Sequence, residues 1–319
     1  MDPAFPHFSV LIDEVLTAFK SCHLKCFVDG TLGAGGHAFH LLEAHPEIEL
    51  YIGIDQDPTA LKIAAQRLLP WKEKIRLKRG NFTEFASFLK AEGLSHMDGM
   101  LLDLGVSSMQ LKEAERGFSF MREGPLDMRM DPDATLTAAD IVNNWSESEL
   151  GRLFRDYGEE KKWRAAAREI VRARAQKLFQ TTTDLVQVLL PVLSHSFKKK
   201  IHPLTLVFQA LRIGVNQELR VVEQVIPQAI DFLSPEGRLS IISFHSLEDR
   251  IVKNEMRFAA SDKWETSGLG GGLFRDKTPL VSLITKKPIS PTDAESKMNP
   301  PSRSAKLRVI EKLRVIEDK

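Results

Sequence analysis

The sequence predicts an α/β protein built on a doubly wound, mostly parallel sheet that is interrupted by an inserted all-helical domain. Two observations carry this prediction. Between residues 8 and 104, short apolar segments alternate with segments of helical spacing, a pattern typical of parallel sheets. The alternation stops between residues 113 and 212, where the pattern is helical throughout, and it resumes at Val221.

The first part of the sheet is predicted from its apolar segments. A helix over residues 8–20 has apolar side chains at helical spacing. Asp57 before Pro58 is a helix start signal and opens a helix that reaches Leu69. The other helices are expected around 38–42 and 85–89, and the strands at 26–28, 50–54, 75–78 and 97–104.

The second part follows the inserted helices. A helix is expected at 221–233 and a strand at 238–244, while 260–305 is rich in Gly, Pro, Ser and Lys and is expected to be a loop. Residues 307–311 alternate well enough for an edge strand, and their sequence is repeated at 313–317. We therefore predict a discontinuous sheet domain and an inserted helical domain. Their ranges are 1–112 with 213–319, and 113–212.

Composition excludes several classes of protein. Of the 319 residues, 43% are hydrophobic and 27% charged, which argues against disorder, collagen and coiled coil. The longest apolar stretch, residues 185–193, contains Gln187 and Pro191 and is too short to span a membrane. No signal or transit peptide is recognised after Met1. The sequence thus predicts a cytoplasmic protein without a membrane partner.

Charge and cysteine content leave the partner open. Lys and Arg number 44 against 43 Asp and Glu, a formal net charge of +1, which neither indicates nor excludes a nucleic acid. Cys22 and Cys26 are the only cysteines. Because a zinc site needs more ligands than this pair supplies, no metal is predicted.

A glycine-rich turn between the first strand and the next helix points to a ligand. Gly33-x-Gly35-x-x-Ala38 fits a loose dinucleotide pattern, for which a tight packing turn is the alternative. Asp29, Asp55 and Asp103 each lie at or directly after the C-terminal end of a predicted strand, at the edge where open parallel sheets bind ligands. Three carboxylates there suit the cationic S-adenosylmethionine better than a pyrophosphate, so a nicotinamide dinucleotide fits poorly.

Six blocks of sequence resemble the MraW-type family, bacterial methyltransferases that act on N4 of a cytidine in small-subunit ribosomal RNA. The resemblance runs from His7 to about Arg308, and the blocks keep the family's order. They are Asp29–His37, Leu101–Ser108, Glu115–Phe120, Gly124–Asp131, Phe208–Ile213 and Ser243–Arg250.

The resemblance implies a class I (Rossmann-like) methyltransferase fold that uses S-adenosylmethionine as methyl donor. The substrate it implies is a decoding-region cytidine of 16S ribosomal RNA, within an assembled or nearly assembled small subunit. The sheet domain would bind the cofactor and the helical domain the RNA. For Phe82 the alternative interpretation is an aromatic side chain of the hydrophobic core. The implied cofactor contacts are Gly33, Gly35, Gly36, His37, Asp55, Phe82, Asp103 and Gln110.

The group that accepts the amine proton is left open by the sequence. Many amino methyltransferases use an Asp/Asn-Pro-Pro-aromatic tetrapeptide after the fourth strand, but residues 103–106 here read Asp-Leu-Gly-Val. The catalytic candidates are therefore Asp103, Ser107 and His245. His245 has a second reading, in which it only caps the helix that follows.

A basic segment supplies charge for RNA binding. Residues 161–177 hold seven basic side chains against one acidic residue, with Ala165, Ile170, Val171 and Ala175 as the expected buried side. Phosphate binding requires such charge, although a solvated helix face is the alternative. The candidate RNA contacts are Arg129, Arg168, Arg172, Arg174, Lys199 and Arg250.

Two other functions compete with this prediction. One is a catalytically silent module that only binds S-adenosylmethionine, and the other is an amino methyltransferase acting on another nucleic acid. The intact acids at residues 55 and 103 speak against the first. The missing tetrapeptide disfavours a typical DNA enzyme. A homodimer is compatible with the sequence.

Overall fold

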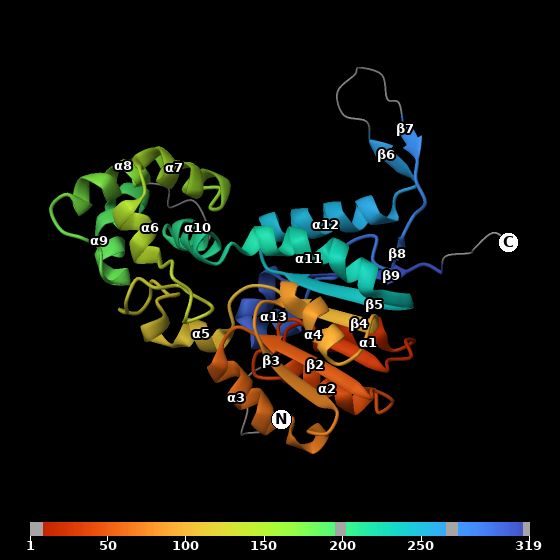
Figure 1. Cartoon of the computed structure of the whole chain (residues 1–319). Helices are drawn as coiled ribbons and strands as arrows, with labels where there is room; N and C mark the ends of the chain where they lie inside the picture. The colour runs from red at the N-terminus through yellow and green to blue at the C-terminus, as the bar shows by residue number, and fades with distance from the viewer. Residues whose placement is uncertain (1–8, 195–201, 266–273, 315–319) are drawn as a thin grey trace. The chain divides into compact units, whose positions relative to one another are not determined.

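The computed structural model describes residues 9–194, 202–265 and 274–314. The chain divides into two compact units (Figure 1). Met1–Gly105 and Leu219–Lys319 form the sheet unit, and Val106–Glu218 form the helical unit. The sequence placed the corresponding borders at residues 113 and 212.

The sheet unit is built on seven strands in the order β3-β2-β1-β4-β5-β9-β8. The first five pair in parallel, whereas β9 pairs antiparallel with both β5 and β8. The predicted mostly parallel sheet is therefore confirmed. The strands are β1 Cys26–Asp29, β2 Leu50–Asp55, β3 Ile75–Arg79, β4 Met97–Asp103, β5 Leu233–Ser243, β8 Val281–Leu283 and β9 Lys306–Lys312.

Helices cover both faces of the sheet, as doubly wound topology requires. Apolar side chains of α1, α2 and α3 form one core with one face, and those of α4, α11 and α12 form a second core with the other. The burial of whole strands such as β1 explains why they are continuous apolar runs rather than alternating ones. The helices are α1 Ile12–Phe19, α2 Gly36–Ala44, α3 Pro58–Arg67, α4 Phe85–Ala91, α11 Glu218–Phe232 and α12 Ser246–Ala260.

The C-terminal part differs from the sequence prediction in two ways. The strand β9 was expected at an edge of the sheet but lies between β5 and β8. Its inner position was not predicted because β8, with three residues, is too short to be recognised from its sequence. The expected loop at 260–305 contains short regular elements in its described residues. Besides β8 they are β6 Lys263–Glu265, β7 Phe274–Asp276, α13 Asp293–Met298 and the 3-10 helix Pro300–Ser304.

The helical unit contains six α-helices within the residues that the structure describes. Four of them begin with a capping box, in which the side chains of Ser107, Thr137, Ser146 and Thr181 accept from the backbone three residues on. Their apolar faces meet in one core that is separate from those of the sheet unit. The helices are α5 Ser108–Lys112, α6 Ala138–Asn144, α7 Glu147–Asp156, α8 Trp163–Arg174, α9 Thr182–Leu193 and α10 Thr205–Asn216.

A charged cluster ties α12 to β9. The Asp249 carboxylate accepts hydrogen bonds from Arg308 Nε at 2.7 Å and Lys306 Nζ at 3.0 Å. Burial would raise the pKa of Asp249, but the hydrogen bonds from these two cations hold it below its ordinary value. The Arg308 side chain is only 8% exposed, so it depends on Asp249 for its neutralisation.

Replacing Asp249 by Ala is expected to lower the free energy of unfolding by about 3 kcal/mol, because it leaves a buried guanidinium without its carboxylate. Urea unfolding at pH 7 measures the change. Asp231→Ala, which removes an exposed carboxylate of α11, is the matched control and should change stability by less than about 0.5 kcal/mol. Equal effects of the two substitutions would contradict the structural role of Asp249.

Candidate active site

Three carboxylates lie at one edge of the sheet because three neighbouring strands end in Asp. Asp29, Asp55 and Asp103 are the last residues of β1, β2 and β4. β1 lies between β2 and β4 and is parallel to both. The carboxyl ends of these strands therefore meet at the edge where ligands of open parallel sheets bind.

The glycine loop connects β1 to α2 at the same edge. Gly33 and Gly35 have φ angles of +53° and +75°, which residues other than glycine rarely adopt. Gly35 is the N-cap of α2, so the loop leads directly into the first turn of a helix, where backbone N–H groups lack intrahelical partners. The backbone can thus approach a ligand closely here.

Asp29 is buried beneath the glycine loop and bonds to it through Thr31. It is 1% exposed, and its carboxylate accepts hydrogen bonds from Tyr51 Oη at 2.9 Å and from Thr31 N at 3.1 Å. Burial raises the pKa of Asp29 to about 6, against the lowering effects of His37 and these hydrogen bonds. Tyr51, whose pKa burial raises well above its ordinary value, is a partner that the sequence analysis missed.

Asp55 holds the loop from the neighbouring strand. Its Oδ2 accepts from Gly33 N at 2.8 Å and its Oδ1 from Asp57 N at 2.8 Å. Burial raises the pKa of this carboxyl to about 6. Since a carboxylate oxygen can accept more than one hydrogen bond, each oxygen keeps capacity for a ligand hydroxyl.

The side chains of His37 and Asp103 carry buried polar atoms that have no hydrogen-bond partner in the described part of the chain. His37 Nε2 lies 3.6 Å from Asp103 Oδ2, and the His37 side chain is 8% exposed. Among the described residues, neither ring nitrogen of His37 nor Asp103 Oδ1 has a hydrogen-bond partner. Buried polar atoms of this kind are rare unless a ligand or water satisfies them.

Thr31 positions Asp103 and was not predicted from the sequence. Its Oγ1 accepts from the Asp103 backbone N at 2.6 Å, which joins the end of β4 to the glycine loop. The two-residue spacing from Asp29 to Thr31, typical of an Asx turn, was the signal available in the sequence.

The other predicted cofactor and catalytic residues have defined local roles. Phe82 is 9% exposed and belongs to the core that includes Met100 and Leu102. Ser107 and Gln110 form the capping box of α5 in the helical unit. His245 is the N-cap of α12, and its Nε2 lies 3.1 Å from Glu248 Oε1. The capping reading of His245 therefore describes its local structure, and its catalytic role stays a prediction.

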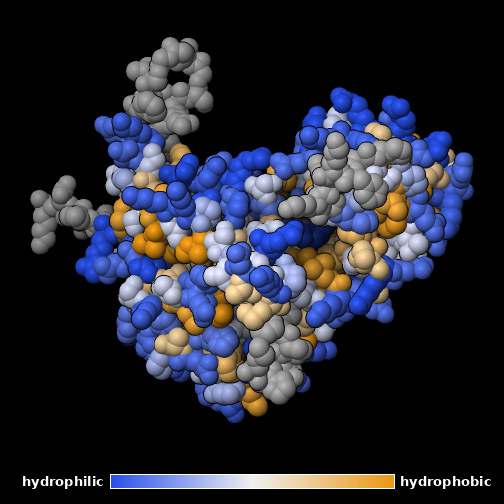
Figure 2. Space-filling model, turned by 180° about the vertical axis from the view of Figure 1, so that it is seen from behind, coloured by the Kyte–Doolittle hydropathy of each residue, from blue (hydrophilic) through white to orange (hydrophobic). Residues whose placement is uncertain are grey.

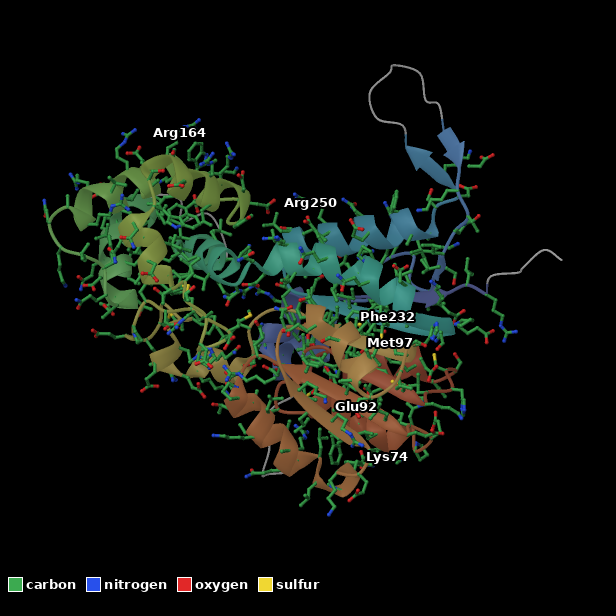
Figure 3. All side chains as sticks on the ribbon, in the orientation of Figure 1. Lys74, Glu92, Met97, Arg164, Phe232 and Arg250 are labelled. Carbon is green, nitrogen blue, oxygen red and sulfur yellow. The ribbon has the colours of Figure 1, made fainter. Side chains whose placement is uncertain are left out.

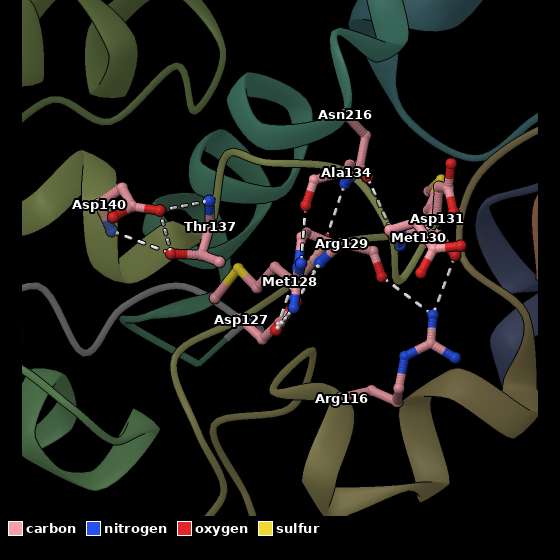
Figure 4. Close-up of polar contacts among 11 residues, drawn as sticks. Arg116, Asp127, Met128, Arg129, Met130, Asp131, Ala134, Thr137, Asp140 and Asn216 are labelled. Carbon is pink, nitrogen blue, oxygen red and sulfur yellow. Dashed lines mark hydrogen bonds and ion pairs between the residues drawn. The ribbon is translucent and has the colours of Figure 1, made fainter.

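Arg129, a predicted RNA contact, is bonded within its own loop (Figure 4). Its Nη2 donates to Asp127 Oδ2 at 2.6 Å and its Nη1 to Ala134 O at 2.6 Å. Asn216 bonds to the backbone on both sides of it, at Met128 O and Met130 N. The guanidinium thus holds a turn whose Met128 has a φ of 63°.

The remaining predicted RNA contacts differ in exposure. Arg168 and Arg172 of α8 are 73% and 74% exposed, and Arg250 is exposed on α12 (Figure 3). Arg174 is half-buried, and its Nη1 donates to Val142 O and Trp145 O at 2.8 and 2.7 Å. Lys199 lies outside the described residues.

Comparison with known proteins decides the family. The model of the MraW methylase family matches residues 4–313. The chain belongs to this family. In its sheet, five parallel strands are followed by the antiparallel β9 and then by β8, which pairs antiparallel with β9. This is accordingly the class I methyltransferase fold that the resemblance implied.

Curated relatives of this methylase match along its whole length. Ribosomal RNA small subunit methyltransferase H of Protochlamydia amoebophila is 65% identical over 311 residues, 98% of each chain. The protein of that name from Chlamydia trachomatis serovar L2 is 46% identical over 314 residues, 98% of each chain. The one from Pelobacter propionicus is 46% identical over 311 residues, covering 97% of this chain and 99% of its own.

Solved structures resemble the chain only weakly. A putative rRNA-methylase from Clostridium thermocellum has a TM-score of 0.45 and 8% identity, covering 96% of this chain and 100% of its own. A putative methyltransferase from Streptococcus mutans in complex with SAH has a TM-score of 0.43 and 10% identity, covering 96% and 100%. In the described part of this methylase, no helix has the length and apolar character that crossing a membrane requires.

Proposed function

We propose that this methylase transfers a methyl group from S-adenosylmethionine to the exocyclic N4 amine of a cytidine in the decoding region of small-subunit ribosomal RNA. The observation that carries the proposal is the group of buried atoms on His37 and Asp103 beside the glycine loop that have no hydrogen-bond partner among the residues described. The relatives named ribosomal RNA small subunit methyltransferase H support the choice of substrate.

The residues at the carboxyl edge fit S-adenosylmethionine. The cofactor carries an ammonium and a sulfonium, and it has no phosphate that three neighbouring carboxylates would repel. We assign Asp55 to the ribose diol, because both of its oxygens are already oriented by backbone N–H groups. The backbone of Gly33, Gly35 and Gly36 admits the methionine end. Phe82 is assigned to one face of the adenine, and Gln110 is retained as a cofactor contact on the resemblance.

When bound, S-adenosylmethionine supplies an electrophilic methyl group, and the chain must present a weak nucleophile to it. The lone pair of cytosine N4 is delocalised into the ring, so alignment and a hydrogen-bond acceptor for the amine are needed. Asp103 is our first choice as acceptor, because Oδ1 is buried and has no partner among the described residues. Ser107 and His245 are the alternatives. N4 is paired inside a duplex, so the cytidine must be single-stranded or flipped out.

Transfer of a radiolabelled methyl group tests the proposal. The acceptors are small ribosomal subunits from cells lacking the enzyme, naked small-subunit RNA and duplex DNA, each digested to nucleosides after the reaction. We expect label in N4-methylcytidine from the subunits, and comparison with naked RNA identifies the assembly state that is recognised. A reaction without protein provides the background.

Each other outcome has a definite meaning. Saturable cofactor binding without label in any acceptor would contradict the proposed activity and indicate a module that only binds the cofactor. Label in DNA would assign the reaction to another nucleic acid. Label at another atom of the ribosomal RNA would retain the substrate and overturn the N4 assignment.

A further inference from the structure

The helix α8 carries arginines at four-residue intervals on one exposed face. Arg164, Arg168 and Arg172 are all exposed, and residues four apart lie on the same side of a helix. We call these three residues the α8 arginine row. A space-filling view shows that hydrophilic side chains predominate along the outer rim of the helical unit (Figure 2).

The buried side of α8 differs from the one expected from the sequence. Ala166, Ala167 and Ile170 are buried, whereas Ala165 and Ala175 are exposed and Val171 is only half-buried. This corrects the predicted face. The observed face divides the basic residues of α8 into two groups. Arg174 points toward carbonyl groups of α6 and of the residue that follows it, whereas the α8 arginine row is exposed to solvent.

Acidic neighbours neutralise the row only weakly. Arg168 Nε lies 4.0 Å from Glu147 Oε1, and these side chains are 73% and 51% exposed. Arg172 pairs with Glu169 of the same helix while remaining 74% exposed. Exposed pairs of this kind contribute little to stability. A partner with more concentrated negative charge can therefore replace these carboxylates at little cost.

Arg164 is held in place by an aromatic ring. Its guanidinium carbon lies 3.9 Å from the centroid of the Trp163 ring, and the residue lies at the outer side of α8 (Figure 3). Trp163 packs so closely on α7 that a Cβ added to Gly151 would lie 2.8 Å from its Cζ3. A stacked guanidinium keeps its planar set of donors available and loses less freedom when it binds a phosphate.

We propose that the α8 arginine row is a binding site for the sugar–phosphate backbone of the RNA substrate. The inference rests on the proposed function for the class of substrate, and it adds where the helical unit grips that substrate. Phosphate is the group that fits evenly spaced, exposed guanidinium groups. Arg129 and Arg174 are excluded from this site, since both are half-buried and their guanidinium groups bond to the chain's own carboxylate and carbonyl oxygens.

The test compares two triple variants of the full chain. One is Arg164→Gln with Arg168→Gln and Arg172→Gln. The control, Lys20→Gln with Lys72→Gln and Lys90→Gln, removes three charges from exposed positions of the sheet unit. Binding to an in vitro transcript of small-subunit ribosomal RNA is measured over a range of salt concentrations. Affinity for S-adenosylmethionine and the thermal midpoint are measured in parallel.

The arginine triple variant is expected to bind the RNA about tenfold more weakly at ~0.1 M salt. The slope of log K against log salt concentration is negative, and its magnitude should decrease by about 2 when three phosphate contacts are lost. Cofactor affinity and the thermal midpoint should match those of the wild type, and the lysine variant should keep the wild-type slope. Equal losses of RNA affinity in the arginine and lysine variants would indicate an effect of net charge and overturn the proposed site. Unchanged RNA binding by the arginine variant would also overturn it.

Single substitutions at Arg164 test the role of stacking. Arg164→Lys keeps the charge but loses the planar fork, so we expect its affinity to lie between those of the wild type and Arg164→Gln. An Arg164→Gln protein with wild-type affinity and slope would remove this residue from the site. If the wild-type protein bound neither this transcript nor small ribosomal subunits from cells lacking the enzyme, both this inference and the proposed substrate would fail. Wild-type RNA binding that the arginine triple variant retains overturns the inference alone.

Discussion

Asp103→Asn is expected to lower the rate of methyl transfer about 100-fold or more, in the range found when a group that assists proton transfer is removed. Asn has the shape of Asp, so the backbone hydrogen bond from Asp103 N to Thr31 Oγ1 should persist. The change removes the negative charge next to His37 and replaces one acceptor oxygen by a donor. Single-turnover transfer and cofactor titration together measure the effect.

The two measurements separate the roles assigned to Asp103. A lower rate at saturating cofactor with unchanged cofactor affinity supports its role as acceptor for the amine. A loss of cofactor affinity assigns it instead to the methionine or adenine end. Near wild-type values for both quantities would remove Asp103 from the site. Asp231→Asn, at an exposed position of α11, is the control for loss of one charge.

Asp55→Asn is expected to weaken the binding of S-adenosylmethionine about 10- to 100-fold, since hydrogen bonds to a charged group contribute about 1.5–3 kcal/mol. The Asp55 oxygens accept from Gly33 N and Asp57 N. An Asn amide nitrogen would face one of these donors, so the loop would lose a hydrogen bond and the ribose an acceptor. Isothermal titration measures the affinity.

Cofactor affinity should also depend on pH in a direction set by the same carboxyls. Burial raises the pKa of Asp55 and of Asp29 to about 6. As the pH falls from 7 to 5 both carboxylates take up protons, and the negative charge that attracts a cationic ligand is lost. Affinity should therefore fall with falling pH. Asp55→Asn should leave a shallower dependence that reflects Asp29, and an unchanged profile would contradict the assignment of Asp55.

Much of the sheet unit was predictable from local pattern. The alternation of strands and helices, the glycines at 33 and 35 and the acids that end β1, β2 and β4 can each be recognised from a few neighbouring residues. Parallel topology then brings those acids to one edge. The position of β9 inside the sheet was not predictable, because it depends on pairing with a three-residue strand, β8, whose sequence has no distinctive period.

The face of α8 shows a different limit. Residues 165, 166 and 167 are all alanine, so hydrophobicity alone gives no reason to bury one of them rather than another. Packing within the helical core selects Ala166 and Ala167. That choice leaves Arg164, Arg168 and Arg172 in solvent and directs Arg174 to Val142 O and Trp145 O.

The sequence by itself determined the α/β class, the glycine loop and the identity of the carboxylates that follow the strands, because strand and turn preferences act over a few neighbouring residues. Only the tertiary structure decided which polar groups are satisfied. Thr31 accepts a hydrogen bond from the Asp103 backbone across 72 positions of the chain. The His37 side chain lies beside the Asp103 carboxylate, and both His37 ring nitrogens and Asp103 Oδ1 have no hydrogen-bond partner among the described residues. Such contacts depend on how distant segments pack, and local preferences do not specify them.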